Sequence, residues 1–357
     1  MKLKITAFAL AAALMLAACT PTPAPAPAPA PATPAPAADP VAEPIDDDIA
    51  AASFILAHAS PEDTVTGLFS ERFADLVDQL SGGAMSVDVF PNSQLGGDVE
   101  IFTNLGVGQI DFIVGTTAPQ VGTIPRLAIF DTPNAFETAE IARRVFEDPA
   151  FMDMIRAEYA ASGYLLLGFA DQFYRAMSSN VRIDTMADFN GVRIRTLENP
   201  FHISYWQALG ASPTPMAFAE VFVGLQQGTI DAQENPYEVI VSAGFYEVQN
   251  YIINTNHLLH LISLVANDAN FRALSPAQQQ VIEQAAAEAI PWARNQADVR
   301  VADREAIIQA SGSTVLDLSP ELLADILAAI APVHEEIRQA VGDELYNAFM
   351  AAIERAS

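Results

Sequence analysis

Two arginines, Arg193 and Arg195, are the first side chains that could bind a charged ligand. They stand in the short β-type run from Gly191 to Arg195, in a chain with only 17 Lys and Arg against 44 Asp and Glu. A guanidinium group presents parallel N–H donors in one plane, so it can hold a carboxylate with two hydrogen bonds. Residues two apart lie on the same face of a strand. Spacing alone therefore does not choose between the two arginines, and either could instead be a surface residue paired with one of the many acids.

Two further polar side chains could shape such a site. Asn235 precedes Pro236 and offers an amide that both donates and accepts, although an Asn before Pro is also typical of a turn. Glu198 follows Arg195 by three residues, and a carboxylate that faced the ligand from there would repel a second carboxylate on it and favour an amine or hydroxyl groups. The alternative for Glu198 is an acidic residue in the first turn of the helix that begins near Pro200, where the helix dipole stabilises it.

Other chemistries have little support in the sequence. His257 and His260 are three apart but fall near a predicted strand start, and none of the five histidines belongs to an HExxH motif. There is no GxSxG, P-loop or GxGxxG motif. The run Asp46-Asp47-Asp48 lacks the Gly and closing Glu of a calcium loop and is interpreted as a solvated linker end. We expect no metal, no cofactor and no catalytic residue.

Composition narrows the class of partner. The 357 residues are 51% hydrophobic and 17% charged, enough for two domains with their own cores. A formal net charge of -27 repels phosphate backbones and anionic lipid headgroups, so nucleic-acid binding is not expected. Surface charge is screened over about 10 Å at 0.1 M salt, so a few local arginines still decide what a pocket binds.

The N-terminus predicts export and anchoring. Lys2 and Lys4 precede a short apolar run from Ile5, and Leu16-Ala-Ala-Cys19 follows it. This arrangement resembles a bacterial lipoprotein signal with Cys19 as the acylated first residue; the alternative is an ordinary secretory signal with an incidental cysteine. Because Cys19 is the only cysteine, an intramolecular disulfide framework is excluded. Residues 21–44 are almost all Pro, Ala and Thr, a composition that favours an extended spacer of roughly 70 Å.

From residue 53 onward, short β-type runs alternate with helical stretches, which predicts an α/β fold. A helix is expected over residues 61–80, and a long one from about Pro276 past Val301. The expected strands are 53–57, 85–89, 112–114, 164–169, 175–178, 192–195, 212–216 and 261–266.

One internal repeat organises this region. Residues 99–111 align without gaps to residues 219–231, with identical Glu, Phe, Leu, Gly, Ile and Asp at six positions. In each copy a helix ends at a Gly, where positive φ is needed, and Ile-Asp begins the next strand. The repeat predicts two similar α/β lobes, unless it is a coincidence between two common helix-Gly-strand units.

Several ordered segments are similar to the DctP-type substrate-binding proteins of TRAP transporters. The resemblance covers residue 54 to the C-terminus and rests on Gly191-Val-Arg-Ile-Arg195, Gly210-Ala-Ser-Pro-Thr-Pro-Met-Ala-Phe-Ala-Glu-Val221, Gly228-Thr-Ile-Asp-Ala-Gln-Glu-Asn-Pro236, Phe90-Pro91 with Gln94-Leu-Gly96, and Phe245-Tyr-Glu-Val248 with Thr255-Asn-His257. It implies a two-lobed, hinged periplasmic clamp with a long C-terminal helix across both lobes, and a sodium-driven membrane permease as partner.

The resemblance also assigns site residues. It places the carboxylate-clamping arginine at Arg195 rather than Arg193, and a second arginine of some members at Arg175, which could otherwise form a structural ion pair. It puts Asn235 in the pocket and Phe218 against the apolar face of the ligand, where the residue type alone would equally suit the core. From the other lobe, Ser60, Asp98 and Thr116 are expected to line the cleft because they stand at strand ends or helix starts.

These observations predict a lipid-anchored periplasmic protein that captures a small organic acid and delivers it to a TRAP permease. The expected organisation is a signal peptide over 1–18, an acylated Cys and linker over 19–52, lobe I over 53–171 plus 262–301, and lobe II over 172–261 plus 302–357. Two alternatives stay open. One is a lipid-anchored hydrolase using acidic pairs such as Glu100 with Asp111 or Asp231 with Glu234, and the other is an ABC-type binding protein. The repeat argues against the hydrolase because the same acids recur in both lobes, whereas a catalytic pair needs one asymmetric site.

Overall fold

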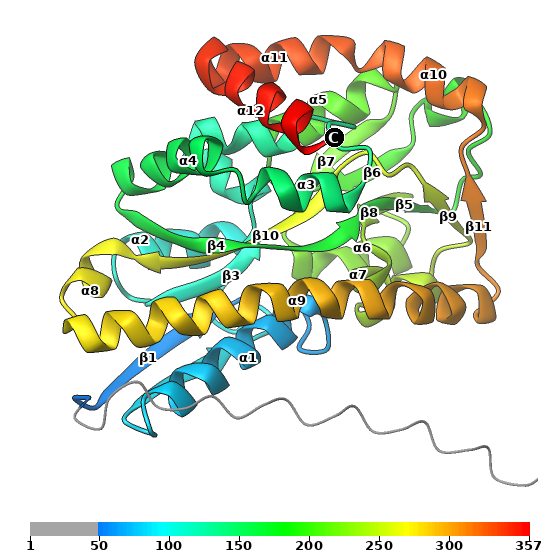
Figure 1. Cartoon of the computed structure of the whole chain (residues 1–357). Helices are drawn as coiled ribbons and strands as arrows, with labels where there is room; N and C mark the ends of the chain where they lie inside the picture. The colour runs from blue at the N-terminus through cyan, green and yellow to red at the C-terminus, as the bar shows by residue number, and fades with distance from the viewer. Residues whose placement is uncertain (1–48) are drawn as a thin grey trace, which may run out of the picture. The chain divides into compact units, whose positions relative to one another are not determined.

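The computed structural model describes residues 49–357, which form two β-sheets flanked by helices (Figure 1). This confirms the expected α/β class. Cys19, the Pro/Ala-rich tract and the run Asp46 to Asp48 lie outside the described residues. Within residues 49–357, no helix combines the length and the apolar character needed to cross a membrane.

The first sheet has the strand order β2-β1-β3-β10-β4. Strand β1 pairs in parallel with β2 and β3, whereas β10 runs antiparallel to its neighbours β3 and β4. Its strands are β1 (Ala52–Ala57), β2 (Met85–Phe90), β3 (Phe112–Thr116), β4 (Tyr164–Tyr174) and β10 (Leu259–Asn267).

The second sheet has the order β11-β9-β5-β8-β6-β7. Strand β6 is parallel to β7 and β8, β5 is antiparallel to β8 and β9, and β11 is parallel to β9. Its strands are β5 (Ala176–Ser179), β6 (Arg193–Thr196), β7 (Ser212–Pro215), β8 (Ala232–Asn235), β9 (Tyr251–Asn254) and β11 (Thr314–Asp317).

Two short segments carry the chain directly between the sheets. Arg175 is the single residue between β4 of the first sheet and β5 of the second, and residues 255–258 lead back from β9 to β10. The backbone N–H of Arg175 donates to the carbonyl of Leu258 over 2.9 Å, which ties the two crossings together. Phe173 has φ 65°, a value that non-glycine residues seldom adopt. We call residues 173–175 and 255–258 the hinge.

The long helix α9 (Pro276–Ala310) is the third link between the sheets. It is about 50 Å long at the α-helical rise per residue, packs against α1 and β4 of the first sheet, and reaches α7 and β11 of the second (Figure 1). Gly168 of β4 permits this packing, because a Cβ at that position would stand 2.3 Å from Cδ1 of Ile290. The expected long helix is therefore confirmed.

The remaining helices cover the faces of the two sheets and enclose three apolar cores. The largest core runs from the first sheet through α3, α4 and α12 to α5 and α11 beside the second. Their bounds are α1 (Val65–Leu80), α2 (Asp98–Gly106), α3 (Ala139–Val145), α4 (Pro149–Ala161), α5 (Pro200–Ala208), α6 (Val221–Gln226), α7 (Tyr237–Ser242), α8 (Asp268–Arg272), α10 (Pro320–Ala329), α11 (Ala331–Val341) and α12 (Asp343–Ala356), with short 3-10 turns at Ala118–Gly122, Pro125–Asp131, Met186–Phe189, Phe218–Glu220 and Phe245–Glu247.

The sequence repeat corresponds to a repeated structural unit, α2 followed by β3 and α6 followed by β8. Gly108 and Gly228 both have positive φ, at 74° and 66°. Asp111 accepts a hydrogen bond from the backbone N–H of Ile55, and Asp231 accepts one from the backbone N–H of Arg193, so each carboxylate binds the backbone of a neighbouring strand. The repeated acid thus has the same structural task in both halves.

Some boundaries differ from the sequence expectation. The helix expected over 61–80 begins at Val65, because the Thr64 side chain accepts from the N–H of Gly67 and caps it. Strands β9 and β11 were not predicted. Strand β8 follows Ile230-Asp231 directly, where the repeat places the start of a strand. The predicted lobe boundaries stay a prediction. Helix α12, assigned to lobe II, packs on α3 and α4 of the assigned lobe I, and α11 contacts elements of both.

Candidate functional site

Arg195 lies in β6 with only 1% of its surface exposed. Its Nε and Nη2 donate to the carbonyl oxygen of Met216 over 2.9 and 2.7 Å. Its Nη1 is buried and has no hydrogen-bond partner among residues 49–357. A buried donor without an acceptor costs about 1–3 kcal/mol, more when it carries charge. The geometry therefore leaves one side of the guanidinium group ready for an acceptor from a ligand.

The charge of Arg195 is set by its surroundings. Burial lowers the pKa of Arg195 to about 10, with the carboxylate of Glu234 opposing this change and the charge of Arg175 adding to it. The group is still a cation at neutral pH. Asp98 and Glu198 also lie within electrostatic reach of it. An anion bound at Arg195 would thus meet two carboxylates beside one guanidinium group.

Asp98 brings the first sheet's side of the molecule to this site. It is the first residue of α2, and the preceding Gly97 lies so close to Ala217 that a Cβ at Gly97 would stand 4.0 Å from the Ala217 Cβ. Although Asp98 retains partial solvent exposure, burial raises its pKa to about 6; the charge of Arg195 opposes the rise and that of Glu198 adds to it. Asp98 and Arg195, 97 positions apart in sequence, therefore lie within electrostatic reach of each other.

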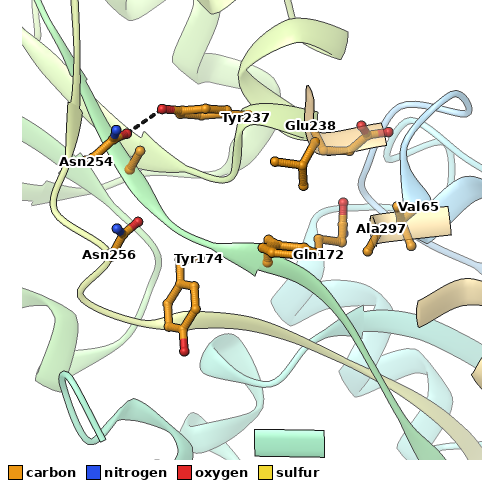
Figure 2. A pocket seen from close by; sticks show the side chains of 11 residues that line it. Val65, Gln172, Tyr174, Tyr237, Glu238, Asn254, Asn256 and Ala297 are labelled. Atoms are coloured by element: carbon orange, nitrogen blue, oxygen red, sulfur yellow. Dashed lines mark hydrogen bonds between the residues drawn. The ribbon is translucent and has the colours of Figure 1, made fainter. Parts of the chain in front are cut away.

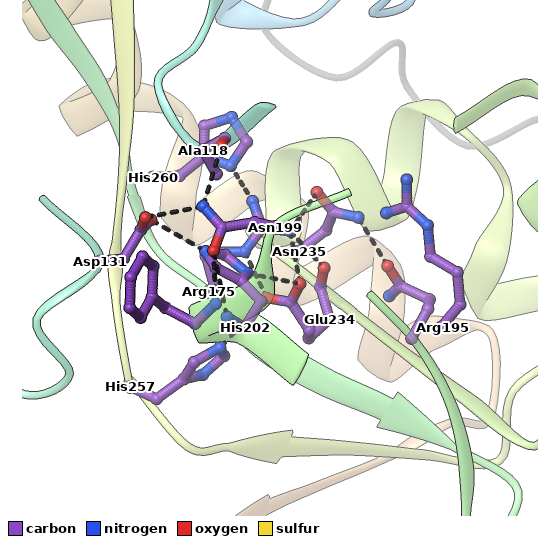
Figure 3. Close-up of polar contacts among 12 residues, drawn as sticks. Ala118, Asp131, Arg175, Arg195, Asn199, His202, Glu234, Asn235, His257 and His260 are labelled. Atoms are coloured by element: carbon purple, nitrogen blue, oxygen red, sulfur yellow. Dashed lines mark hydrogen bonds and ion pairs between the residues drawn. The ribbon is translucent and has the colours of Figure 1, made fainter. Parts of the chain in front are cut away.

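Arg175 is as buried as Arg195 but has a partner for each side of its guanidinium group (Figure 3). Its Nε forms an ion pair with Glu234, its Nη2 donates to Glu234 Oε1 over 3.0 Å and to Asn235 Oδ1 over 3.1 Å, and its Nη1 contacts Nδ1 of His260. Figure 3 shows Arg195 to one side of this cluster. The charge of Arg175 is balanced within the protein.

Glu234 is the centre of that cluster. Burial alone would raise the pKa of Glu234, but Arg175, His202 and His257 hold it well below its ordinary range. His257 Nε2 lies 3.1 Å from Glu234 Oε2, and the hydroxyl of Thr255 lies 2.8 Å from His257 Nδ1. The hinge segment 255–258 is therefore tied to strand β8 through a buried carboxylate.

His202 connects Glu234 to the first sheet's side of the molecule. Its Nε2 lies 3.1 Å from Asp131 Oδ1 and its Nδ1 lies 3.8 Å from Glu234 Oε1. Burial alone would lower the pKa of His202, but these two carboxylates raise it to about 9. Asn199 adds a second link, because its Nδ2 donates to Asp131 Oδ2 over 2.7 Å and to the Ala118 carbonyl over 2.8 Å.

The other predicted site residues are placed as follows. Asn235 is 3% exposed and its Nδ2 donates to Gln233 Oε1 over 2.6 Å, so its amide is held on both sides. Phe218 is half-buried next to Ala217 and packs on Phe245, with ring centroids 5.8 Å apart. Glu198 is exposed, three residues beyond Arg195.

Ser60 and Thr116 stand at the ends of β1 and β3. Both side chains are partly exposed. Thr116 borders a cavity of about 10 Å³, room for about one water molecule, that is also lined by Arg175, His202 and His260. The backbone carbonyl of Ser60 accepts from the N–H of Asn92 over 3.1 Å, and no side-chain contact joins Ser60 to the two arginines among the described residues.

Sequence reasoning missed most of the buried polar cluster. Asp131, Asn199 and His202 were not singled out. His257 and Glu234 belong to segments that carry the family resemblance, but no role in a polar cluster was predicted for them or for His260. Within residues 49–357, no group of three His, Cys, Asp or Glu side chains could hold a metal ion. The sequence held one indication of this cluster, because three of the five histidines stand close in sequence to predicted site segments.

The acidic pairs considered for hydrolysis have structural partners. Asp111 accepts from Ile55 N–H and from Asn270, Asp231 pairs with Arg193, and Glu234 pairs with Arg175. Arg193 is the exposed member of the two neighbouring arginines, in agreement with the structural role expected for it. Its partner Asp231 is the residue that corresponds to Asp111 in the sequence repeat.

Comparison with known proteins identifies the family of this chain. The DctP model, described as bacterial extracellular solute-binding protein family 7, matches residues 56–340. A solute-binding protein of Verminephrobacter eiseniae is 33% identical over 277 residues, covering 77% of this chain and 82% of its own.

Two solved structures have a similar fold. The sugar acid binding protein of Advenella mimigardefordensis in complex with galactonate has 29% identity and a TM-score of 0.84, covering 87% of this chain and 100% of that one. A TRAP periplasmic solute-binding protein of Shewanella oneidensis with bound succinate has 27% identity and a TM-score of 0.81, covering 85% of this chain and 99% of that one.

Proposed function

The chain belongs to the DctP family of bacterial extracellular solute-binding proteins, and from this premise we propose that it captures a small organic acid at Arg195 and delivers it to a TRAP permease. The observation that carries the proposal is the buried Nη1 of Arg195, a charged donor with no protein acceptor in the described residues. A ligand carboxylate supplies the missing acceptor. The relatives with bound galactonate and succinate support a carboxylate as the common ligand group.

The binding step follows from the two sides of the site. One carboxylate oxygen accepts from Arg195 Nη1, while Met216 keeps the guanidinium group oriented through its carbonyl. The partly exposed ring of Phe218 covers the carbon skeleton, and Asn235, held by Gln233 and Arg175, borders the ligand with its amide. Asp98 borders the ligand from the first sheet's side of the molecule. A ligand that touches both sides favours the closed arrangement by its differential affinity for it.

The charges around Arg195 narrow the class of acid. A ligand with one carboxylate and several hydroxyl groups, or with one carboxylate and an ammonium group, can donate hydrogen bonds to Asp98 and Glu198. A second carboxylate in the same place would face two acidic side chains, and like charges brought together cost affinity. We therefore propose a hydroxylated or zwitterionic monocarboxylate rather than a C4-dicarboxylate. In this respect the site suits galactonate, the ligand of the Advenella protein, better than succinate.

We also propose that Cys19 is acylated and holds the protein at a bacterial membrane from the periplasmic side. The proposal rests on the sequence Leu16-Ala-Ala-Cys19 and on the Pro/Ala-rich tract that follows it. An anchored capture protein stays near the permease that it serves, which raises its effective concentration there. Exchange of Cys19 for Ser should release the protein from membranes without changing acid binding; persistent membrane association would contradict the anchor.

A thermal-shift comparison of galactonate, succinate and galactose tests the proposed ligand class. A ligand at 100 times its dissociation constant stabilises the folded state by about 2.7 kcal/mol. We expect the largest rise in melting temperature with galactonate, a smaller rise with succinate and none with uncharged galactose. Glu198→Gln is the matched variant, and it should increase the succinate response alone. A galactose response equal to that of galactonate would contradict the carboxylate mechanism.

A further inference from the structure

A cavity of about 290 Å³ lies beside the hinge (Figure 2). Its wall is formed by the end of β4 and the start of β5, by α7, by the first residue of α1, and by α9. Most of the lining is apolar, with Val65, Phe173, Ala176, Ala297 and Val301 among the residues that form it. It does not include Arg195 or any other residue proposed to touch the organic acid.

One buried acceptor in this cavity has no partner. Gln172 is 2% exposed and lines the cavity, and its Nε2 donates to the hydroxyl of Thr66 over 2.5 Å. Its Oε1 is buried and accepts no hydrogen bond within the described part of the chain. Figure 2 shows the Gln172 side chain extending toward the side of the cavity where Glu238 lies. Buried polar atoms are normally satisfied, so an unpaired carbonyl oxygen at a cavity wall points to a missing donor.

The charges around the cavity are balanced without a ligand. Glu238 pairs with Arg300 and Arg304 of α9 over 2.8 Å each. Arg304 also lies 3.3 Å from Asp63, so two cations face two anions. Neither a cationic nor an anionic ligand would gain an uncompensated partner, and either would lose hydration on entering a mainly apolar space.

We propose that this hinge cavity is a second small-molecule site, which binds an uncharged aromatic compound whose single N–H or O–H group donates to Gln172 Oε1. A dry cavity of about 150 Å³ is large enough to bind benzene, so the space beside the hinge accepts a one- or two-ring compound. Phe173 and Tyr237 provide aromatic walls, and offset or edge-to-face ring contacts add to the apolar burial.

Indole and N-methylindole are the probes that test the site, because only indole carries the donor. Titration calorimetry of the full chain should give one indole site, with N-methylindole binding at least about fivefold more weakly, since it leaves Gln172 Oε1 unpaired. Absence of indole binding at millimolar concentration, or equal affinity for the two compounds, would overturn the proposal.

Two variants of α9 locate the bound probe. Val301→Phe fills the cavity from a partly exposed position and should abolish indole binding, whereas Val299→Phe adds the same ring at a position 60% exposed and should leave indole binding unchanged. Both variants should keep the organic-acid response of the wild type, which separates this site from the one at Arg195. Unaltered indole binding in Val301→Phe would place the probe elsewhere and overturn the proposal.

Discussion

Arg175 and Arg195 are both almost completely buried, yet their surroundings differ in one decisive respect. Glu234, Asn235 and His260 occupy the donors of Arg175, whereas Arg195 has only the carbonyl of Met216 and keeps Nη1 unpartnered within residues 49–357. A buried guanidinium group with a carboxylate partner holds protein segments together. We propose that one without a carboxylate partner, as at Arg195, is available to a ligand. Burial and residue type are the same for both arginines, so the unpaired donor is the feature on which this proposal rests.

The contrast extends to the elements that each arginine joins. Arg175 stands in the hinge, and its cluster links β8, α5 and the segment 255–258 through Glu234, His202 and His257. Arg195 lies in β6, and Asp98, the first residue of α2, lies within electrostatic reach of it. We therefore expect changes at the Arg175 cluster to affect stability first, and changes around Arg195 to affect ligand binding first.

The largest effect is expected from Glu234→Gln. This substitution leaves the buried charge of Arg175 without its carboxylate, and breaking a buried ion pair in this way costs about 3–5 kcal/mol. Chemical denaturation should show that loss in the free energy of unfolding. Asp231→Asn is the control, because its pair with Arg193 is partly exposed and should contribute about 1 kcal/mol or less. Equal losses in the two variants would contradict the structural role of the Arg175 cluster.

A smaller, pH-dependent effect is expected from His202→Gln. The folded-state pKa of His202 is raised to about 9 from the ordinary 6.5, so its charge stabilises the fold fully below pH 6.5 and this contribution is lost as pH rises through about 9. The shift corresponds to at most about 3 kcal/mol. Melting curves of wild type and variant should differ most at pH 6 and converge above pH 9. A difference in melting temperature between wild type and variant that grows with pH would contradict the raised pKa of His202.

Arg195→Lys should lower affinity for the organic acid at least about tenfold, or roughly 1.4 kcal/mol. Lysine keeps the charge but loses the planar donors that Met216 and the ligand share. Stability should change little, because no carboxylate is left unpaired. Arg193→Lys is the matched control, on the same strand and outside the site. Calorimetric titration with the best-binding acid should show a loss of affinity in Arg195→Lys and little change in Arg193→Lys. Equal losses of affinity in the two variants would contradict the assignment of ligand binding to Arg195.

The smallest effect is expected at Asp98. Its pKa of about 6 means that it carries a full charge only above that pH, when it opposes a second carboxylate on the ligand. Succinate itself takes up a proton between pH 7 and pH 5, so the contribution of Asp98 is the difference between wild type and Asp98→Asn. As pH falls over this range, the wild-type affinity for succinate should rise a few-fold more than that of the variant. The same titrations with galactonate, which has a single carboxylate, provide the baseline. A wild-type affinity for succinate that rises no more than that of the variant toward pH 5 would contradict this account of Asp98.

The sequence predicted the fold better than it predicted the polar cluster. The alternation of Met85, Val87 and Val89, and the long apolar-periodic run after Pro276, are local patterns, and both elements formed where expected. Strands β9 and β11 were missed although β5, β6 and β7 are equally short and were expected, so length is not the reason. Their pairing, of β9 with β5 and of β11 with β9, depends on residues far away in the sequence.

The site residues also fall into those that have a local signal in the sequence and those that do not. Arg195 could be singled out because a cation at a strand end is unusual in so acidic a chain, and resemblance chose it over Arg193. The polar cluster around Glu234 could not be read from spacing, because Asp131, His202, Glu234 and His257 come from four separate segments and meet only through the crossing of the chain between the sheets. The unpaired Nη1 depends on that packing and has no signature in the sequence.

A crystal structure with the best-binding acid distinguishes the roles of the two arginines. We expect a ligand carboxylate oxygen within hydrogen-bond distance of Arg195 Nη1, with Arg175 still paired to Glu234. A carboxylate bound to Arg175 in place of Glu234, with Arg195 Nη1 not in contact with the ligand, would contradict these roles.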